Sequence, residues 1–451
     1  MKRTFVVLIA AFGSVDALGG GFQLFEQSVK GLGGAFSDQA TASDASTVFW
    51  NPAGLTRLEG DNVSVAGQVI KATGRFSDQG TRTFLPPPNG LPMSGGNGGD
   101  PGDYTGIPNL YYSHQFNNKW TVGLGVNAPF GLATKYDNNW VGRYYALNTE
   151  LQTLNINPSF GVRLNEKISV GGGLNVEYAK AKLSNAIDFS TVCLAQAAAV
   201  PALGPLCAAS GYTTPGNAAT DGKVAVKGDD WALGWNVGVM FDVSPDTRVG
   251  VAYRSKLSHD IKGDATFSKP ATLPAPIGAA ASFTDGGVRT SIVLPETATL
   301  ALHTSVSKDL MVTSSATWTR WSRLQELRLR FDNGAADAAT PLEWRDTWRV
   351  AVGGEYRINS SWALRTGIAY DQTPVKNNLR TPRVPDADRL MLSMGATYRI
   401  SPDASVDLGY AHWFVHDASI NLATAAGGTL VGTYQKPYID VVGVQYNHRF
   451  R

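Results

Sequence analysis

The sequence lacks any apolar run long enough to cross a membrane as a helix. The apolar run nearest the amino terminus, residues 5–12, falls far short of the roughly 20 residues that a spanning helix needs. The mean hydropathy of −0.12 and the charged fraction of 17% agree with this reading. An excess of one charge is also missing, because 39 basic residues stand against 37 acidic ones. These absences exclude a helical membrane protein and give no reason to expect a nucleic-acid partner.

Cysteine is nearly absent too. The chain has only Cys193 and Cys207, and both fall in one long predicted loop. In a chain that is exported to an oxidising compartment, such a pair is typical of a disulfide rather than of a metal site or a nucleophile. The bond would close a small lobe rich in Ala and Pro, with ~3 kcal/mol of stabilisation for a loop of this size.

Catalytic and cofactor motifs are missing as well. The chain has no Gly-x-Ser-x-Gly, His-Glu-x-x-His, Cys-x-x-Cys or phosphate-loop pattern. Its six histidines are scattered. His412 and His416 would lie ~13 Å apart on a strand, too far to share one metal ion. We therefore expect no cofactor, no metal site and no catalytic residues.

What the sequence does contain is alternation. Residues 62–450 read as fourteen segments with apolar or aromatic side chains at every second position. In one segment Trp362, Leu364 and Tyr370 alternate with Ala363 and Asp371. Successive side chains of a strand point to opposite faces, so each segment has one apolar and one polar face. A membrane barrel turns the apolar face outward to lipid.

The connections between these segments alternate in length. Six short links have tight-turn compositions, and seven long links separate them. An even strand count with short turns at one end and long loops at the other is typical of outer-membrane barrels. The short links are Asn117-Asn118, Asn165-Glu166, Ser244-Pro245, Ser307-Lys308-Asp309, Asn359-Ser360 and Ser401-Pro402-Asp403, and the long ones are 73–107, 129–150, 183–230, 259–287, 332–343, 372–387 and 415–436. Pro295 interrupts segment 288–306 and predicts a bulge or bend there.

The first residues indicate export. Lys2 and Arg3 precede the short apolar run, and small residues follow it near Ala17. We interpret residues 1–19 as a signal peptide that is cleaved at about 17–20. The expected site of action is the outer membrane of a Gram-negative cell.

Residues 20–60 do not alternate and contain a Gly-rich stretch, 31–34, that we interpret as a hinge. A barrel of fourteen strands is too wide for its own side chains to fill. The segment is rich enough in Phe and Trp to argue against disorder. We therefore predict an all-β protein, in which 61–451 form a 14-stranded antiparallel transmembrane β-barrel and 20–60 form a small helical hatch plugging the lumen.

Several motifs resemble one family. The stretch Gly21-Phe22-Gln23-Leu24, with Gly31-Leu32-Gly33 and Asn51-Pro52-Ala53, resembles the amino-terminal hatch of the FadL/TodX family of outer-membrane transporters for long-chain fatty acids and hydrocarbons. The resemblance continues through Leu294-Pro295-Glu296 and Pro385-Asp386-Ala387-Asp388-Arg389. It implies a fourteen-stranded barrel, a hatch in the lumen and diffusion of apolar ligands.

In that family the third strand kinks inward and opens the barrel wall beside the hatch. The matching residues here are Pro129, Phe130, Gly131 and Leu132. Local chemistry agrees, since Pro129 cannot donate to the sheet ladder and Gly131 tolerates unusual backbone angles. We expect the hatch residues Asn51, Pro52 and Ala53 to lie against the inner wall near this opening.

The resemblance also implies an apolar ligand pocket, for which we expect Phe22, Leu24 and Phe130. Fatty-acid transporters of the family place a basic residue near the end of the fifth strand, where this chain has Asn185, preceded by Lys180 and Lys182. A second basic position is matched by Arg328. Either these groups rebuild a carboxylate clamp, or the substrate lacks a carboxylate.

These observations predict passive uptake of hydrophobic compounds, with long-chain fatty acids favoured over aromatic or aliphatic hydrocarbons. The mechanism would be binding in the lumen, hatch movement and lateral exit through the wall. An outer-membrane adhesin or a lipid-acting enzyme remain as remote alternatives. The expected partners are a hydrophobic small molecule, outer-membrane lipid and lipopolysaccharide, and the chain is expected to be a monomer.

Overall fold

The computed structural model describes residues 20–88 and 90–450 and shows a closed barrel of fourteen antiparallel strands, as predicted. The barrel closes where the first strand pairs with the last, from Asp61 and Phe450 onward. The predicted signal peptide, 1–19, lies outside the described residues. The wall strands are β1 (Asp61–Asp78), β2 (Tyr104–Gln115), β3 (Trp120–Asn127), β5 (Asn148–Arg163), β6 (Ile168–Asp188), β7 (Asp221–Asp242), β8 (Thr247–Arg254), β11 (Thr297–Ser305), β12 (Leu310–Thr319), β15 (Thr347–Arg357), β16 (Trp362–Asp371), β17 (Arg389–Ser401), β18 (Ala404–Val415) and β20 (Gly428–Phe450).

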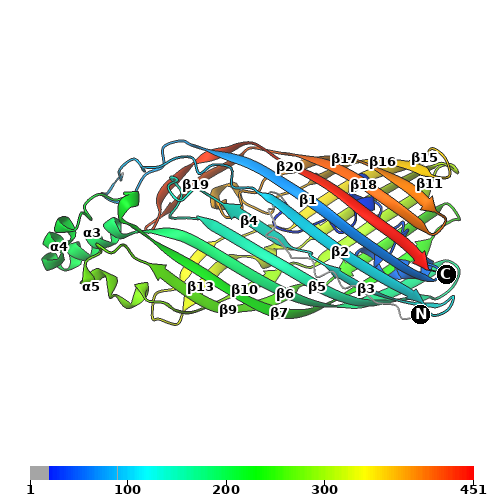
Figure 1. The fold of residues 1–451 in the computed structure, drawn as a ribbon, viewed down its shortest axis with the longest axis horizontal. Coiled ribbons are helices and arrows are strands. Elements are labelled where there is room, and N and C mark those ends of the chain that lie inside the picture. The colour runs from blue at the N-terminus through cyan, green and yellow to red at the C-terminus, as the bar shows by residue number, and fades with distance from the viewer. Residues whose placement is uncertain (1–19, 89, 451) are drawn as a thin grey trace.

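The two ends of the barrel differ as the connections predict. All six short links join wall strands at the end where the chain terminates, which we call the short-turn end. The loop helices gather at the opposite, long-loop end (Figure 1). Sorting of connections by length is therefore a confirmed property of the fold.

The long loops are shorter than predicted, because strand pairing continues past the apolar segments. The loop predicted at 183–230 begins after Asp188, since β6 and β7 pair as far as Asp188 and Asp221. Beyond the membrane the outward side chains of these strands are polar, so the extension shows no alternation of apolar and polar residues. Six further strands extend the wall there, namely β4 (Gly131–Lys135), β9 (Leu257–Ser268), β10 (Gly286–Leu294), β13 (Glu326–Phe331), β14 (Ala338–Pro341) and β19 (Ala418–Thr424). The bend predicted at Pro295 separates β10 from β11.

The strands carry the predicted two faces. Along β16, Trp362, Leu364 and Ile368 are exposed, whereas Ala363 and Ala369 are fully buried. The apolar face of each strand therefore points outward, as contact with lipid requires. In the described part of the chain, no helix is long and apolar enough to cross a membrane.

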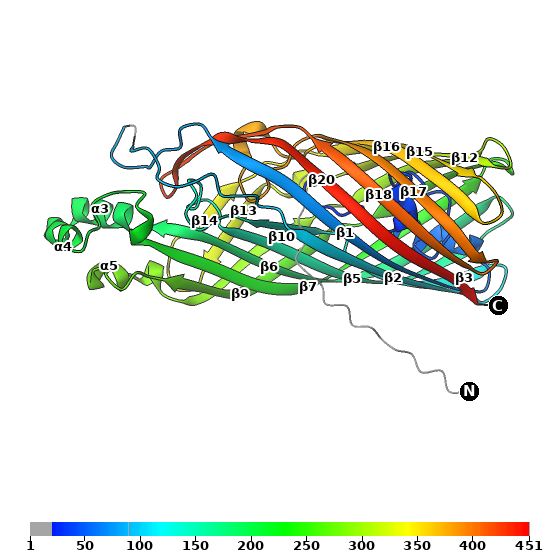
Figure 2. The ribbon, with the colours of Figure 1, turned by 45° about the horizontal axis from the view of Figure 1, so that its top comes forward.

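Residues 20–60 lie inside the barrel (Figure 2). Glycines on the inner wall allow close approach: a Cβ on Gly395 of β17 would lie 2.8 Å from the Cα of Gly33, and one on Gly171 of β6 would lie 2.4 Å from the carbonyl carbon of Pro52. Side chains at these wall positions would displace the segment. Its helices are α1 (Val29–Gly33), α2 (Thr47–Trp50) and η1 (Pro52–Arg57).

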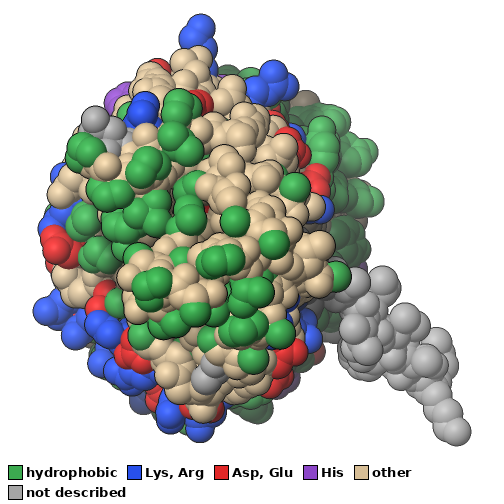
Figure 3. Space-filling view, turned by 90° about the vertical axis from the view of Figure 1, so that its left-hand side faces the viewer, with side chains coloured by type: hydrophobic (Ala, Val, Ile, Leu, Met, Phe, Trp, Pro, Cys, Tyr) green, Lys and Arg blue, Asp and Glu red, His purple; other side chains and the backbone are tan. Residues whose placement is uncertain are grey.

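A helical cap covers part of the long-loop end. A disulfide joins Cys193 to Cys207 across two helices, and Phe189, Tyr212 and Ile277 pack around it. Figure 3 shows apolar side chains gathered on this end of the molecule. The loop helices are α3 (Phe189–Ala199), η2 (Pro201–Leu203), α4 (Gly204–Ala209), η3 (Ala218–Thr220), α5 (Ala275–Gly278), η4 (Ala281–Phe283), η5 (Trp321–Arg323) and η6 (Asn377–Leu379).

Candidate ligand-binding site and wall opening

The barrel wall is interrupted after the third strand. Pairing of β2 with β3 ends at Leu110 and Val126, and β4 then pairs with β5 alone. The residues between β3 and β4 are Ala128, Pro129 and Phe130. The wall therefore has no strand pairing between β4 and the upper part of β2.

The amino-terminal segment bonds to this interruption. The amide of Leu24 donates to the carbonyl of Pro129 at 2.8 Å, and the amide of Gly131 donates to the carbonyl of Phe22 at 2.9 Å. The side chain of Gln27 donates to the carbonyl of Ala128 at 2.8 Å. The start of the segment thus acts as a short extra strand on the lumenal side of the break.

Phe22 lies in an aromatic cluster at this place. Its ring centroid is 4.8 Å from that of Trp321, 5.6 Å from that of Trp344 and 6.2 Å from that of Phe130. Phe22 and Trp344 also line an apolar cavity, together with aliphatic side chains of the wall and loops. These include Leu132, Leu151, Leu183 and Leu324. We call this space the apolar cavity; it suits a hydrocarbon chain.

Arg383 also lines the apolar cavity, although it comes from the loop between β16 and β17. It donates to the carbonyl of Asn148, to the Thr149 hydroxyl and to the Asn185 Oδ1, at 3.2–3.3 Å. Burial lowers the pKa of Arg383 to about 10, which leaves it charged at neutral pH. No carboxylate of the described residues forms an ion pair with it. An anionic head group would supply the missing charge.

The structure separates the remaining expected ligand residues. Asn185 contacts Arg383, but Leu24 packs in a different apolar cluster with Phe25 and Leu32. Lys180 and Lys182 lie on the outer face of β6, because the alternating Ala179 and Ala181 face inward. Lys182 pairs there with Glu150 at 3.0 Å. Neither lysine side chain reaches the apolar cavity in this structure.

Arg328 is likewise outside the cavity. It lies on the outer face of β13, where it pairs with Glu326 at 2.7 Å and with Asp337 at 3.3 Å. Its neighbour Leu327 points inward instead. The interpretation of Arg328 as a lumenal clamp residue is therefore wrong for this structure, because strand alternation turns its side chain to the exterior.

Asn51, Pro52 and Ala53 contact the inner wall. The Asn51 amide donates to the carbonyls of Val239 and Val251, at 3.2 Å each, and its Oδ1 accepts from the Ala53 amide at 3.1 Å. Pro52 borders a small cavity that Pro129 and Phe130 also line. This motif thus fixes the amino-terminal segment to β7 and β8 and faces the wall break across that cavity.

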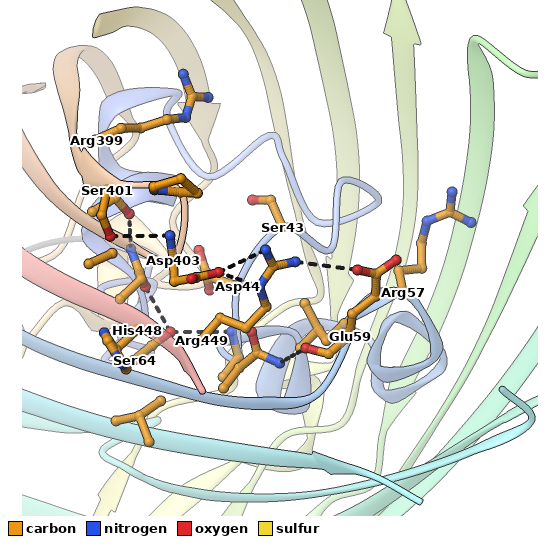
Figure 4. Close-up of a pocket in the computed structure, with 18 of the residues that line it drawn as sticks. Ser43, Asp44, Arg57, Glu59, Ser64, Arg399, Ser401, Asp403, His448 and Arg449 are labelled. Carbon is orange, nitrogen blue, oxygen red and sulfur yellow. Dashed lines mark hydrogen bonds and ion pairs between the residues drawn. The ribbon is translucent and has the colours of Figure 1, made fainter. Parts of the chain in front are cut away.

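A third cavity, at the short-turn end, is polar (Figure 4). Arg449 joins Asp403 at 2.9 Å and Glu59 at 3.3 Å, and Arg57, Ser43 and Arg399 lie nearby. Such a lining is unsuited to a hydrocarbon. Within the described ranges, no group of three or more His, Cys, Asp or Glu side chains is arranged to hold a metal ion.

The sequence pattern does not predict three residues of the site, namely Arg383, Trp321 and Trp344. All three come from outside the wall strands, where side-chain alternation carries no information about facing. The sequence does indicate which way the two lysines face. Lys180 and Lys182 lie on the same face of the strand as Tyr178, and Tyr178 contacts the exposed Trp231 on the outer face.

A closed barrel with an internal segment, a wall break and an apolar cavity beside it is an architecture suited to transport across the outer membrane. The family model described as outer membrane protein transport protein (OMPP1/FadL/TodX) matches residues 10–450. The chain belongs to this family, and it is an outer-membrane protein.

Full-length relatives support this assignment. The chain is 31% identical, over all of its length and 99% of the relative, to a putative outer membrane protein of Neisseria meningitidis serogroup B. It is 30% identical to the long-chain fatty acid transport protein of Escherichia coli K12, with 93% of each chain covered.

Solved structures show the same fold. A FadL homologue of Pseudomonas aeruginosa superposes with a TM-score of 0.85 at 25% identity, covering 96% of this chain and all of the other. The toluene transporter TodX of Pseudomonas putida superposes with a TM-score of 0.66 at 17% identity, covering 91% and 95%.

Proposed function

We propose that the chain mediates passive uptake of long-chain fatty acids across the outer membrane. The observation that carries this proposal is the apolar cavity with Arg383 at its edge. The cavity matches an alkyl tail, and the guanidinium matches a carboxylate through charge-assisted hydrogen bonds. The relatives described as long-chain fatty acid transport proteins support the same substrate class.

The proposed route uses residues 20–60 as a hatch. Phe22 contributes to the cavity while the backbone at Phe22 and Leu24 bonds to the wall break. A shift of this short strand would therefore change the cavity and free the break in one movement. The ligand would then leave sideways, through the opening at Pro129–Leu132, into the membrane.

Energetics favour such a coupled design. Burial of each methylene contributes ~0.8 kcal/mol, so a sixteen-carbon tail gains more than ~10 kcal/mol. Binding is therefore easy and release is the difficult step. Removing Phe22 from the cavity wall would weaken the bound state, and a lateral exit would avoid returning the tail to water.

The test is a competition for a bound fluorescent fatty acid between oleate and oleyl alcohol at neutral pH. We expect oleate to compete about tenfold better in the wild type, because one charge-assisted bond is lost in the alcohol. Arg383→Gln should erase the difference. The matched control Arg357→Gln removes an exposed charge at the short-turn end and should preserve it. Equal competition in the wild type would overturn the fatty-acid assignment.

Equal competition would favour the second candidate, uptake of uncharged hydrocarbons. The aromatic cluster of Phe22, Trp321 and Trp344 favours this candidate, because flat rings of a ligand pack well against tilted indoles. In either case we propose a monomeric channel without catalytic activity, surrounded by outer-membrane lipid and lipopolysaccharide. The adhesin alternative is less well supported, because it assigns no role to the apolar cavity.

A further inference from the structure

The barrel wall has a second interruption, between β10 and β13. β10 pairs with β9 along its whole length, but with β13 only at Val288–Phe331 and Arg289–Arg330. Pairing of the wall resumes at Thr297 and Thr319 of β11 and β12. Among the described residues, no backbone hydrogen bond joins 290–295 to 321–329. The two segments enclose a gap.

Cavities meet this gap from both sides. The apolar cavity reaches it from the lumen, where Ile292 of β10 faces Leu324 and Leu327. A groove reaches it from outside, lined by Thr290 and Ser291 of β10 and by Arg328 of β13. Along β10 the groove-lining residues Thr290 and Ser291 directly precede Ile292, which lines the cavity. The Thr290 hydroxyl is buried and has no hydrogen-bond partner within the described part of the chain.

The outer groove carries a row of cations. Lys262 of β9 stands opposite Arg289 of β10, which stands opposite Arg330 of β13. Like charges directly opposite on neighbouring strands destabilise a sheet unless counter-charges are near. Asp332 pairs with Arg289 at 3.1 Å. Asp229 of β7 stands opposite Lys262, but Lys262 forms no ion pair with any described residue.

The acidic groups around the groove are Asp229, Asp260, Glu326, Asp332 and Asp337. Asp260 accepts from Ser291, Glu326 pairs with Arg328, and Asp337 pairs with Arg328 and Arg330. Because Arg289, Arg328 and Arg330 all form ion pairs, the unpaired positive charge lies at the Lys262 end of the groove. That end is the place for an anionic group.

The gap stands at the level of lipid head groups. Trp318 of β12 and Trp348 of β15 are paired on the outer face, and the gap begins just beyond Thr319, on the long-loop side. Exposed Trp and Tyr rings mark the membrane interface in outer-membrane barrels. A head group in the groove would lie just above this belt.

We propose that the gap between β10 and β13 is a lateral port for a single-chain anionic amphiphile. During entry the carboxylate is held outside by Lys262 and Arg289, while the alkyl tail passes between Ile292 and Leu327 into the apolar cavity. The head group then follows and binds Arg383. The port rests on the proposed function, since it supplies the same cavity from the outer leaflet.

The first test measures the rates at which oleate and oleyl alcohol associate with the full-length protein with Lys262→Gln and Arg289→Gln combined. We expect about tenfold slower oleate association and unchanged alcohol association. The matched control combines Lys180→Gln and Lys182→Gln, which remove two outward cations from β6, and should leave both rates unchanged. An unchanged rate of oleate association in the first variant would overturn the port.

A second test removes no charge from the barrel wall, so it does not depend on whether the first variant folds normally. A photoreactive phenylalanine analogue at Ser291 should cross-link to labelled oleate, whereas one at Leu392, an exposed position on β17, should not exceed background. Cross-linking of lipopolysaccharide in place of oleate would overturn the port as assigned. If Arg383→Gln still erases the preference for oleate while Ser291 gives no cross-link, the port fails and the proposed function stands.

Discussion

The backbone amide of Gly21 donates a hydrogen bond to the Asp386 carboxylate at 2.8 Å, which fixes the start of the amino-terminal segment to the loop between β16 and β17. Asp386 also accepts from the Thr373 hydroxyl at 2.6 Å. Gly21 has φ +69°, and a Cβ there would lie 2.5 Å from the Trp321 ring, so only glycine fits this passage. The anchor lies beside the aromatic cluster of Phe22.

This anchor should depend on pH. Burial raises the pKa of Asp386 to about 7, although Arg389 nearby opposes the shift. When the segment moves and water reaches the carboxyl, its pKa returns to about 3.9. The anchored state is therefore favoured at low pH, and this preference is lost progressively as the pH rises from about 4 to about 7.

We expect amides of residues 20–25 to exchange faster at pH 8 than at pH 5, after correction for intrinsic rates, when measured by mass spectrometry. Asp386→Asn removes the titration and should flatten the profile. Protection that increases with pH in the wild type would contradict the anchor.

Phe22 offers a test of the apolar cavity. Phe22→Asp places a carboxylate against Trp321 and Trp344, where burial of an unpaired charge costs several kcal/mol. We expect at least a tenfold loss of oleate affinity, measured by displacement of a fluorescent fatty acid. Phe22→Leu, which keeps the site apolar, should retain most of it. Heat-modifiable gel migration should show a folded barrel in both, and normal binding by Phe22→Asp would remove Phe22 from the site.

Substitutions at residues 129–131 should close the wall break. Replacing Pro129-Phe130-Gly131 by Val-Thr-Val restores the amide of the first residue and favours extended backbone, so β3 and β4 should become one strand paired with β2. Uptake of labelled oleate by whole cells should fall, while oleate still binds the purified protein. Unchanged uptake would mean that ligands leave at the short-turn end instead.

Much of the barrel was predictable because each wall strand repeats one physical rule. Lipid outside and a wet lumen inside force a period of two, as β16 shows from Trp362 to Asp371. The stretch 31–34, predicted as a hinge, is mostly helix α1 instead. Ser28 caps that helix by accepting from the Gly31 amide at 3.1 Å, and the wall glycines allow it to pack closely.

The ligand residues were harder to predict, because the cavity is built where strand alternation does not apply. Arg383 comes from a loop that no periodicity locates. The gap between β10 and β13 depends on which strands stay unpaired, a long-range property that the local pattern of Ile292 or Leu327 does not contain. Alternation does exclude Lys180 from the lumen once Ala179 is known to face inward.

Arg143 gives the last prediction, on the cap at the long-loop end. Its guanidinium is fully buried and joins three loops: it pairs with Asp221 at 2.6 Å and donates to the carbonyls of Ser94 and Gly216, at 2.7 Å each. Lys cannot reproduce this planar fork. Arg143→Lys keeps the charge beside Asp221 but should weaken the cap by about 1 kcal/mol for each hydrogen bond that the ammonium cannot form.

The cap should then open locally while the barrel stays folded. We expect faster proteolysis within residues 189–220 and unchanged heat-modifiable migration, because the wall strands keep their hydrogen bonds. Arg345→Lys is the matched control, since the Arg345 guanidinium donates to the carbonyl of Thr373, away from this cap. Equal proteolysis of wild type and Arg143→Lys would show that the disulfide and the apolar contacts of Phe189 hold the cap without the arginine.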